Sequence, residues 1–268
     1  MTLRLTGINI YPIKSCRGIA LSEWEIDAFG LRYDRRWMVV DDTGTFITQR
    51  THPRMALVAV KVGDGVLQID APGMPTLETP LRPSAAVVTQ VVVWNFAGPS
   101  TWLGEAAARW FTKFLGTTCS LVHMGDDVVR PVNPLFAPQA TRVSFADGYP
   151  LLLISEESLA DLNGRLSVPL PMNRFRPNLV VAGGEPYGED GWGRIVISGV
   201  RLQVVKPCAR CLITTTDQGT GVRAKEPLRT LASYRKVGDE VMFGQNVVHH
   251  NTGHLRIGDS VTRSEPRG

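Results

Sequence analysis

The chain has 268 residues, of which 43% are hydrophobic and 20% charged, and its mean hydropathy is −0.02. This composition is typical of a folded globular protein and excludes a disordered chain, and no uncharged stretch of 18 apolar residues indicates a membrane span. The formal net charge of +4 comes from scattered arginines, which excludes the dense basic stripe of a nucleic-acid-binding protein. The length favours two domains.

The cellular compartment is read from the first residues and from the cysteines. The sequence opens Met1-Thr2-Leu3-Arg4-Leu5, which alternates like a strand and does not resemble a signal peptide. Four cysteines at irregular spacing are too few for a disulfide framework, so thiols stay available as ligands. We therefore expect a cytoplasmic protein that does not associate with membranes.

The first third of the chain is predicted to be rich in β structure. A strand at 3–13 runs into a polar turn in which Lys14 and Ser15 place an ammonium beside a hydroxyl. This pairing suits a phosphate, although a solvated turn is the other interpretation. Two hairpins follow, with strands at 38–40 and 45–49 and at 56–62 and 66–69.

The middle of the chain contains its clearest helix. Residues 73–84 carry three prolines and are expected to be irregular, and the apolar run 87–94 is expected to be a strand buried on both faces. Apolar residues with helical spacing at 103–115 predict a helix that ends at Gly116. The proline-containing segment 128–142 is interpreted as a crossing between domains or a lid.

The last third is predicted to be compact β structure with short helices. A strand at 151–154 precedes a helix at 156–162 capped by Ser155, and a second helix is expected at 226–235. Pro177 biases Arg176 to an extended conformation at the start of a strand at 179–182. Further strands are expected at 194–197, 200–206, 243–249, 253–257 and 260–262.

Cys208 and Cys211 form a C-x-x-C pair that is expected on a tight connection between strands, because the β-branched run 212–216 follows it. Four interpretations compete. A structural zinc site lacks its second pair, since Cys16 and Cys119 are isolated, and a thioredoxin-like dithiol normally precedes a helix. Two buried cysteines, or one thiolate ligand of a soft metal, remain open.

Six segments carry a resemblance to a known family. They are P-C-A-R-C-L-I-T-T-T-D at 207–217, Y-P-I-K-S-C-R-G at 11–18, D-R-R-W at 34–37, S-F-A-D-G-Y-P at 144–150, F-R-P-N at 175–178 and F-G-Q-N at 243–246. In this order they resemble the MOSC domains (molybdenum cofactor sulfurase C-terminal), in the branch of the mitochondrial amidoxime-reducing component and its bacterial relatives.

The resemblance implies a mainly β fold with short helices (α+β). A β-rich MOSC N-terminal domain would cover 1–122, with residues through Arg35 contributing to the cofactor site, and a β-barrel MOSC domain would cover 123–265. The implied cofactor is Mo-molybdopterin, whose metal is held by two dithiolene sulfurs and one protein cysteine. That ligand and catalytic residue would be Cys211, with Cys208 in a structural role.

The other cofactor-binding residues follow from the same resemblance. Lys14, Ser15 and Arg35 would hold the pterin phosphate. Arg176 and Asn178 would donate hydrogen bonds to the pterin and its flanking groups. Asp147 would accept hydrogen bonds from pterin nitrogens or orient Arg176.

The implied reaction is two-electron reduction of a small N-hydroxylated substrate, such as an amidoxime or hydroxylamine, with release of water. Two alternatives stay open, a non-catalytic carrier or sulfur-relay protein for the cofactor and a C-x-x-C dithiol oxidoreductase. The four cysteines cannot supply a 2Fe-2S cluster as well as a molybdenum ligand. We therefore expect the protein to receive electrons from a separate acidic iron-sulfur or flavin reductase through a salt-sensitive contact. We also expect it to be a monomer.

Overall fold

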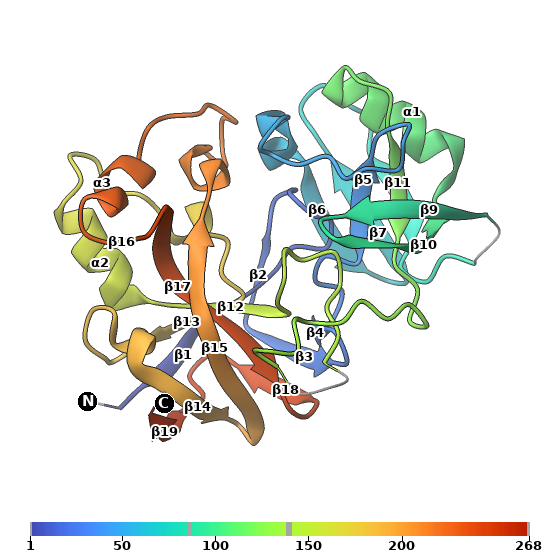
Figure 1. Ribbon diagram of the computed structural model, residues 1–268. Helices are drawn as coiled ribbons and strands as arrows, with labels where there is room; N and C mark the ends of the chain where they lie inside the picture. The colour runs from blue at the N-terminus through green and yellow to red at the C-terminus, as the bar shows by residue number, and fades with distance from the viewer. Residues whose placement is uncertain (1, 85–86, 138–140, 267–268) are drawn as a thin grey trace.

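The computed structural model describes residues 2–84, 87–137 and 141–266, and it is mainly β with short helices, as predicted. Figure 1 shows two halves that lie side by side. One half contains the largest sheet and both chain ends, and the other contains the longest helix described, α1 (Gly104–Leu115). In the described ranges no helix is long and apolar enough to cross a membrane.

The largest sheet follows the order β19-β14-β15-β17-β12-β13-β1-β2, with β16 paired to β17. Its strand pairs are antiparallel except that of β12 with β13. Alternating apolar residues of these strands, such as Leu5, Leu153 and Leu202, form its core. The strands are β19 (Val261–Pro266), β14 (Trp192–Ile197), β15 (Val200–Arg210), β17 (Glu240–His249), β12 (Leu151–Ser155), β13 (Leu179–Ala182), β1 (Arg4–Ile10), β2 (Ile19–Leu21) and β16 (Lys236–Val237).

The beginning of the chain is built into this C-terminal half. Strand β1 pairs with β13, and β3 (Glu23–Asp27) pairs with β18 (Gly253–Arg256) and with β4 (Gly30–Leu31). Strands β18, β3 and β4 form a separate three-stranded sheet, so the chain contributes strands to this half through Leu31. Lys14 follows β1 and its backbone N–H donates to Trp37 O in β5, so it lies at the boundary between the two halves.

The second half consists of two smaller sheets covered by α1. A four-stranded sheet has the order β5-β11-β10-β9, and a three-stranded sheet the order β6-β7-β8. Helix α1 buries Trp110, Phe111 and Phe114 in the core of this half and ends at Gly116 with φ 73°, as predicted. The strands are β5 (Trp37–Val40), β11 (Ser120–His123), β10 (Phe96–Trp102), β9 (Val88–Val93), β6 (Ala59–Gly63), β7 (Val66–Asp70) and β8 (Leu77–Pro80).

Several predicted elements of this half were wrong. Strand β9 is not buried on both faces: it buries Val91 and Val93 on one face and exposes Val88 and Val92 on the other. It is also an edge strand, since only β10 forms a continuous ladder with it. The predicted strand 45–49 is reduced to isolated bridges at Thr45 and Phe46. The segment 73–84 is not wholly irregular, since it contains β8, and β10 and β11 were not predicted.

The helices of the C-terminal half are short. Helix α2 (Glu156–Gly164) begins after Ser155, whose Oγ accepts a hydrogen bond from Ser158 N at 3.1 Å, so the predicted cap is confirmed. Helix α3 (Leu228–Ala232) is shorter than the predicted 226–235. Four 3₁₀ helices complete the described elements: η1 (Pro53–Leu57), η2 (Met172–Arg174), η3 (Gly188–Gly191) and η4 (Leu212–Thr215).

Candidate functional site

One pocket receives residues from both halves of the molecule and contains every residue that the sequence predicted for the site. Its walls come from the turn after β1, the loop before β12, the segment before β13, and the end of β15 with η4. Both thiols of the C-x-x-C pair line it. The seven predicted residues that line it are Lys14, Ser15, Arg35, Asp147, Arg176, Asn178 and Cys211.

Lys14 is buried at the boundary between the halves. Its Nζ donates to Phe145 O at 2.8 Å and to Asp147 Oδ1 at 2.5 Å. Burial lowers the pKa of Lys14 to about 8, although the attraction to Asp147 opposes that shift. The Lys14 ammonium therefore lies in the pocket, and its removal from water makes the charged form less favourable.

Asp147 is the acidic partner of two cations. The surrounding protein by itself would raise the pKa of this carboxyl, but attraction to Lys14 and Arg50 outweighs that effect and holds the pKa below its usual range. The indole N–H of Trp94 also donates to Asp147 Oδ1 at 3.2 Å. Asp147 therefore orients Lys14 and Arg50, and not Arg176, whose side chain contacts Gln218.

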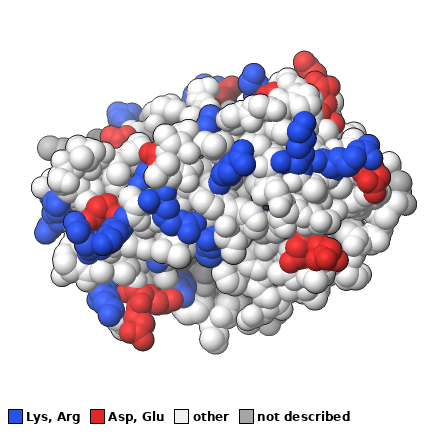
Figure 2. All heavy atoms as spheres, turned by 90° about the horizontal axis from the view of Figure 1, so that it is seen from above, with Lys and Arg blue, Asp and Glu red and all other residues white. Residues whose placement is uncertain are grey.

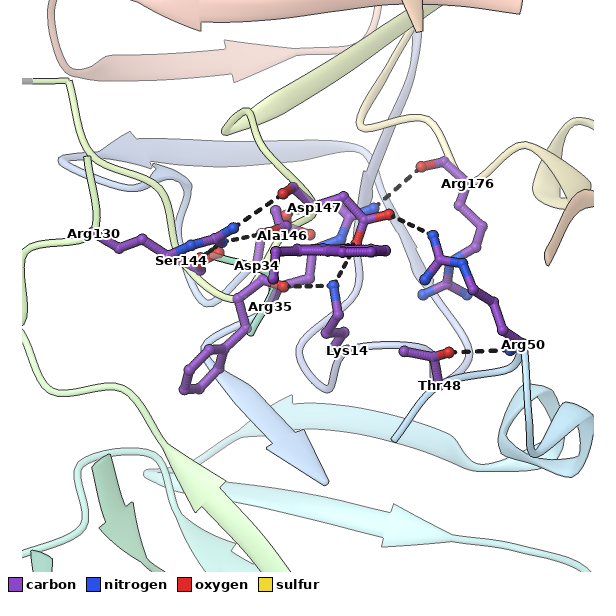
Figure 3. A network of polar contacts seen from close by, with 12 residues as sticks. Lys14, Asp34, Arg35, Thr48, Arg50, Arg130, Ser144, Ala146, Asp147 and Arg176 are labelled. Atoms are coloured by element: carbon purple, nitrogen blue, oxygen red, sulfur yellow. Dashed lines mark hydrogen bonds and ion pairs between the residues drawn. The ribbon is translucent and has the colours of Figure 1, made fainter. Parts of the chain in front are cut away.

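Arg130 braces the loop that carries Asp147, as Figure 3 shows. Its Nη1 donates to Ser144 O at 2.6 Å and to Ala146 O at 2.5 Å, and its Nη2 donates to Asp147 O at 3.0 Å. Burial lowers the pKa of Arg130 to about 10. Arg130, near the start of the segment 128–142 that was predicted to be a crossing or a lid, thus stabilises the loop with Asp147. Residues 138–140 of this segment lie outside the described residues.

Arg35 is fixed by two side chains. Its Nη1 donates to Asp34 Oδ2 at 2.6 Å and to Asn178 Oδ1 at 2.9 Å. The amide of Asn178 has protein partners at both ends, because Nδ2 donates to Asn9 O at 3.1 Å and Oδ1 also accepts from Leu152 N at 3.2 Å. The contacts of Asn178 therefore position Arg35, while its predicted hydrogen bond to a cofactor stays a prediction.

The prediction that Arg176 is extended was wrong, because its backbone lies in the left-handed region with φ 57°. Its guanidinium is buried. It and Arg35 both stack on the ring of Tyr11, with their Cζ atoms 4.2 and 4.3 Å from the centroid. Burial lowers the pKa of Arg176 to about 10. Within the described residues it forms no salt bridge to a carboxylate, so a bound anion would relieve the cost of burying this charge.

The prediction that both thiols lie on a tight connection between two strands was wrong. Strand β15 continues through Cys208 to Arg210, and Cys211 directly precedes η4 instead of a strand. The cause is local, because Thr214 donates from its N at 3.1 Å and from its Oγ1 at 2.9 Å to Cys211 O, which stabilises a turn over an extended run. A short 3₁₀ helix therefore follows the C-x-x-C pair, so the missing helix no longer distinguishes this pair from a thioredoxin-like dithiol.

The two thiols have different surroundings. Cys208 lies in β15 against an apolar cluster that includes Phe175, and its Sγ accepts from Arg210 Nη1 at 3.1 Å. Cys211 lies at the start of η4, and both cysteines are partly buried and free of disulfide bonds. Cys211 lines the same pocket as Arg50 and helps to raise the pKa of Arg50.

Arg174, which the sequence did not single out, anchors the segment that carries Cys211. This buried side chain donates to Thr214 O at 3.1 Å, to Thr215 O at 3.3 Å and to Asp217 Oδ2 at 3.0 Å. Two of these acceptors are backbone carbonyls 40 and 41 residues away. No local pattern in the sequence could have revealed this contact.

A reciprocal pair of amides joins the N-terminal turn to the same segment. Gln49 Nε2 donates to Gln218 Oε1 at 3.2 Å and to Ser15 O at 2.7 Å, and Gln218 Nε2 donates back to Gln49 Oε1 at 3.1 Å. Both glutamines are buried. The turn with Lys14 and Ser15 therefore folds against the segment that follows Cys211.

Arg50 is a further pocket residue that the sequence analysis missed. Its Nη2 donates to Asp147 Oδ2 at 3.2 Å, and its guanidinium lies 4.8 Å from the ring centroid of Trp94. Burial would lower its pKa, but attraction to Asp147 and Cys211 outweighs burial and raises it. The only sequence signal was its place directly after the expected strand 45–49.

The chemistry of this pocket suits an anionic group that carries a soft metal. Within the described ranges, no three His, Cys, Asp or Glu side chains converge to hold a metal, so a metal beside Cys211 must bring other ligands with it. Among the described residues that line the pocket, two buried donor atoms have no hydrogen-bond partner, Arg50 Nη1 and Arg210 Nε. Asp147 is the acidic residue among the described lining side chains, whereas the basic ones are Lys14, Arg35, Arg50, Arg176 and Arg210.

Comparisons with known proteins show which family the chain resembles. Residues 2–118 match the MOSC N-terminal beta barrel domain and residues 140–262 match the MOSC domain. Mitochondrial amidoxime-reducing component 1 of Homo sapiens is 38% identical, over 94% of this chain and 80% of that protein. Mitochondrial amidoxime reducing component 2 of Rattus norvegicus is 37% identical, over 97% of this chain and 82% of that protein.

Proposed function

The chain belongs to the MOSC family, and from this premise we propose that it reduces N-hydroxylated compounds with a bound molybdenum cofactor. The relatives that match almost the whole chain are named amidoxime-reducing components. The observation that carries the proposal is that all seven residues predicted for the cofactor line one pocket. They come from five separate segments of the chain, and only the fold brings them together.

The residues of this chain would share the work of holding the cofactor. Cys211 would ligate the metal as a thiolate, and Lys14, Ser15 and Arg35 would bind the phosphate. Arg176, buried and without a carboxylate partner among the described residues, would neutralise further negative charge. The cofactor, when bound, supplies the two-electron redox chemistry.

Cys211 is proposed as the ligand in preference to Cys208 because of what each sulfur contacts. The sulfur of Cys208 already accepts a hydrogen bond from Arg210 and packs against an apolar cluster. Cys211 sits on a segment anchored by Arg174, which fixes the direction of its backbone. A ligand held on a rigid segment keeps its geometry while the metal changes oxidation state.

The protein part of the reaction is binding, orientation and control of charge. The N-hydroxylated substrate gains two electrons and two protons, the N–O bond breaks, an N–H bond forms and water leaves. Lys14, Arg50 and Arg176 keep the pocket positive. Such fixed charges stabilise negative charge that develops on a departing oxygen.

We also propose that the two electrons come from a separate iron-sulfur or flavin protein. Of the four cysteines, Cys16 and Cys119 are buried and Cys211 is assigned to molybdenum, so an iron-sulfur cluster has no ligand set in this sequence. Figure 2 shows basic side chains spread over the face of the molecule seen from above, and the sequence pI is about 9.0. An acidic donor would complement this surface.

Metal analysis and turnover test the proposal together. The purified protein is expected to contain molybdenum and pterin in equal amounts and to reduce benzamidoxime with an artificial electron donor. Metal without turnover would favour the carrier or sulfur-relay alternative, and turnover of disulfides without metal would favour the dithiol oxidoreductase. The cytoplasmic location and the monomeric state stay predictions.

A further inference from the structure

We propose that Arg50 binds the substrate, donating a hydrogen bond from Nη1 to the oxygen of the N-hydroxyl group beside Cys211. This inference rests on the proposed N-reductive function and assigns a role to a residue that the family resemblance left unassigned. It starts from a buried donor atom without a partner in a pocket whose other cations have structural partners or a proposed role in holding the cofactor.

The guanidinium of Arg50 is held in place from two sides. Nη2 donates to Asp147 Oδ2 at 3.2 Å, and the guanidinium lies over the ring of Trp94, with its Cζ 4.8 Å from the centroid. Trp94 is itself tied to Asp147 by its indole N–H and to Phe46 by ring packing at 5.0 Å. Figure 3 shows Arg50 and Lys14 meeting the two oxygens of Asp147.

The backbone of Arg50 is fixed as well. Its N–H donates to Thr48 Oγ1 at 3.1 Å, and its carbonyl accepts from Arg223 Nη2 at 3.2 Å. A long side chain normally loses rotamer freedom when it binds a ligand. Here Asp147, Trp94 and the backbone contacts have already removed much of that freedom, so little is lost on binding.

One donor atom of Arg50, Nη1, lacks a hydrogen-bond partner. This atom is buried, while the residue lines the pocket. A buried N–H group without an acceptor is unfavourable, and a ligand oxygen would satisfy it. An N-hydroxyl oxygen is small, polar and able to accept this bond.

The position of Arg50 relative to Cys211 decides which part of the substrate it would meet. Arg50 and Cys211 line the same pocket. In the proposed reaction the N–O bond would break beside Cys211, the residue that would hold the metal. A cation fixed there would orient the N–OH group and stabilise the negative charge that develops on oxygen as the N–O bond breaks.

This role differs from a grip on the cofactor. Arg35 and Arg176 share the ring of Tyr11, and Arg35 is fixed by Asn178. Arg50 instead shares Asp147 and Trp94 and comes from the other half of the molecule. Loss of Arg50 should therefore leave the cofactor bound, whereas loss of Arg35 should not.

The experiment compares Arg50→Leu and Arg50→Lys with Arg54→Leu in the holoprotein. Arg54 is an exposed arginine four residues away that stacks on Phe114 at 4.7 Å, so it serves as the matched control. Molybdenum per chain, calorimetric affinity for benzamidoxime in the oxidised protein, and kcat and KM are measured for each. Thermal unfolding verifies that each variant is folded.

Arg50→Leu is expected to keep its molybdenum, to bind benzamidoxime about tenfold more weakly and to lose on the order of 100-fold in kcat/KM. Arg50→Lys should restore part of both, and Arg54→Leu should match the wild type. Loss of molybdenum in Arg50→Leu would assign Arg50 to the cofactor and overturn the inference. Unchanged affinity and kcat/KM would overturn it too, and a wild type that reduces no N-hydroxylated compound would defeat the proposed function and this inference with it.

Discussion

Lys14 Nζ lies 2.5 Å from Asp147 Oδ1, although 133 residues separate the two in the chain. This ion pair joins the turn after β1 to the loop before β12. Arg130 donates to the backbone carbonyl of Asp147, so the backbone that carries the carboxylate is held in place. The pocket is therefore assembled by contacts between distant segments, and each of them can be tested.

The first prediction concerns pH and Lys14. Because burial lowers the pKa of Lys14 from 10.5 to about 8, the unfolded chain binds more protons than the folded protein between these values. The free energy of unfolding of the cofactor-free wild type should rise with pH in this window relative to Lys14→Met, by at most about 1.4 kcal/mol per pH unit. Urea unfolding at several pH values measures the difference.

The control for this pH effect is Lys113→Met, which changes an exposed lysine of α1. Its free energy of unfolding should keep a constant offset from the wild type across the same window. Parallel curves for Lys14→Met and the wild type would show that Lys14 does not titrate with a lowered pKa.

The second prediction concerns retention of the cofactor. Arg35→Ala should weaken binding of the cofactor by about 1.5–3 kcal/mol, the contribution of a charged hydrogen bond. Since that change leaves the carboxylate of Asp34 without its ion pair, it is made in an Asp34→Asn background. Molybdenum per chain after extensive dialysis is the measurement.

Arg109→Ala is the reference for Arg35→Ala, because Arg109 is an exposed arginine on α1. It should retain as much molybdenum as the wild type. If Arg35→Ala retains full occupancy as well, Arg35 does not bind the cofactor.

The third prediction concerns Arg174. Arg174→Met removes the donors to two carbonyls of the Cys211 segment and one ion pair, and it should destabilise the protein by about 1.5–3 kcal/mol. Asp217→Asn removes only the partly exposed ion pair and should cost less than about 1 kcal/mol. Equal effects of the two variants in urea unfolding would show that the carbonyl contacts contribute little.

The fourth prediction concerns the electron donor. The isolated protein should not sustain turnover of benzamidoxime with NADH or NADPH alone, because nothing in this sequence is assigned to accept a hydride. Activity should appear with a reductase or an artificial donor, and only the activity with a protein donor should fall as salt is added. Sustained turnover without any added carrier would refute the requirement for a separate donor.

The sequence was sufficient where local chemistry decides the structure. The periodic apolar residues of α1, Gly116 at its end and the Ser155 cap are short-range signals, and all three were confirmed. The motifs also identified residues that meet in one pocket. Each of them could be recognised without knowing its neighbours in space.

Long-range partners explain what the sequence could not reveal. Val88 and Val92 look like core residues until the sheet order places β9 at an edge. Arg130 and Arg174 act on backbone carbonyls, which every residue carries, so no side-chain pattern marks their targets. The importance of Arg50 becomes visible only with its unpartnered Nη1 in place.

The most direct test of the central claim is the number of sulfur ligands on molybdenum, measured by X-ray absorption in the wild type, Cys211→Ser and Cys208→Ser. Two dithiolene sulfurs and one thiolate should give three sulfurs in the wild type and in Cys208→Ser. Cys211→Ser should show two sulfurs or no bound molybdenum, with loss of benzamidoxime reduction. Three sulfurs in Cys211→Ser, or equal loss of metal and activity in both variants, would contradict ligation by Cys211.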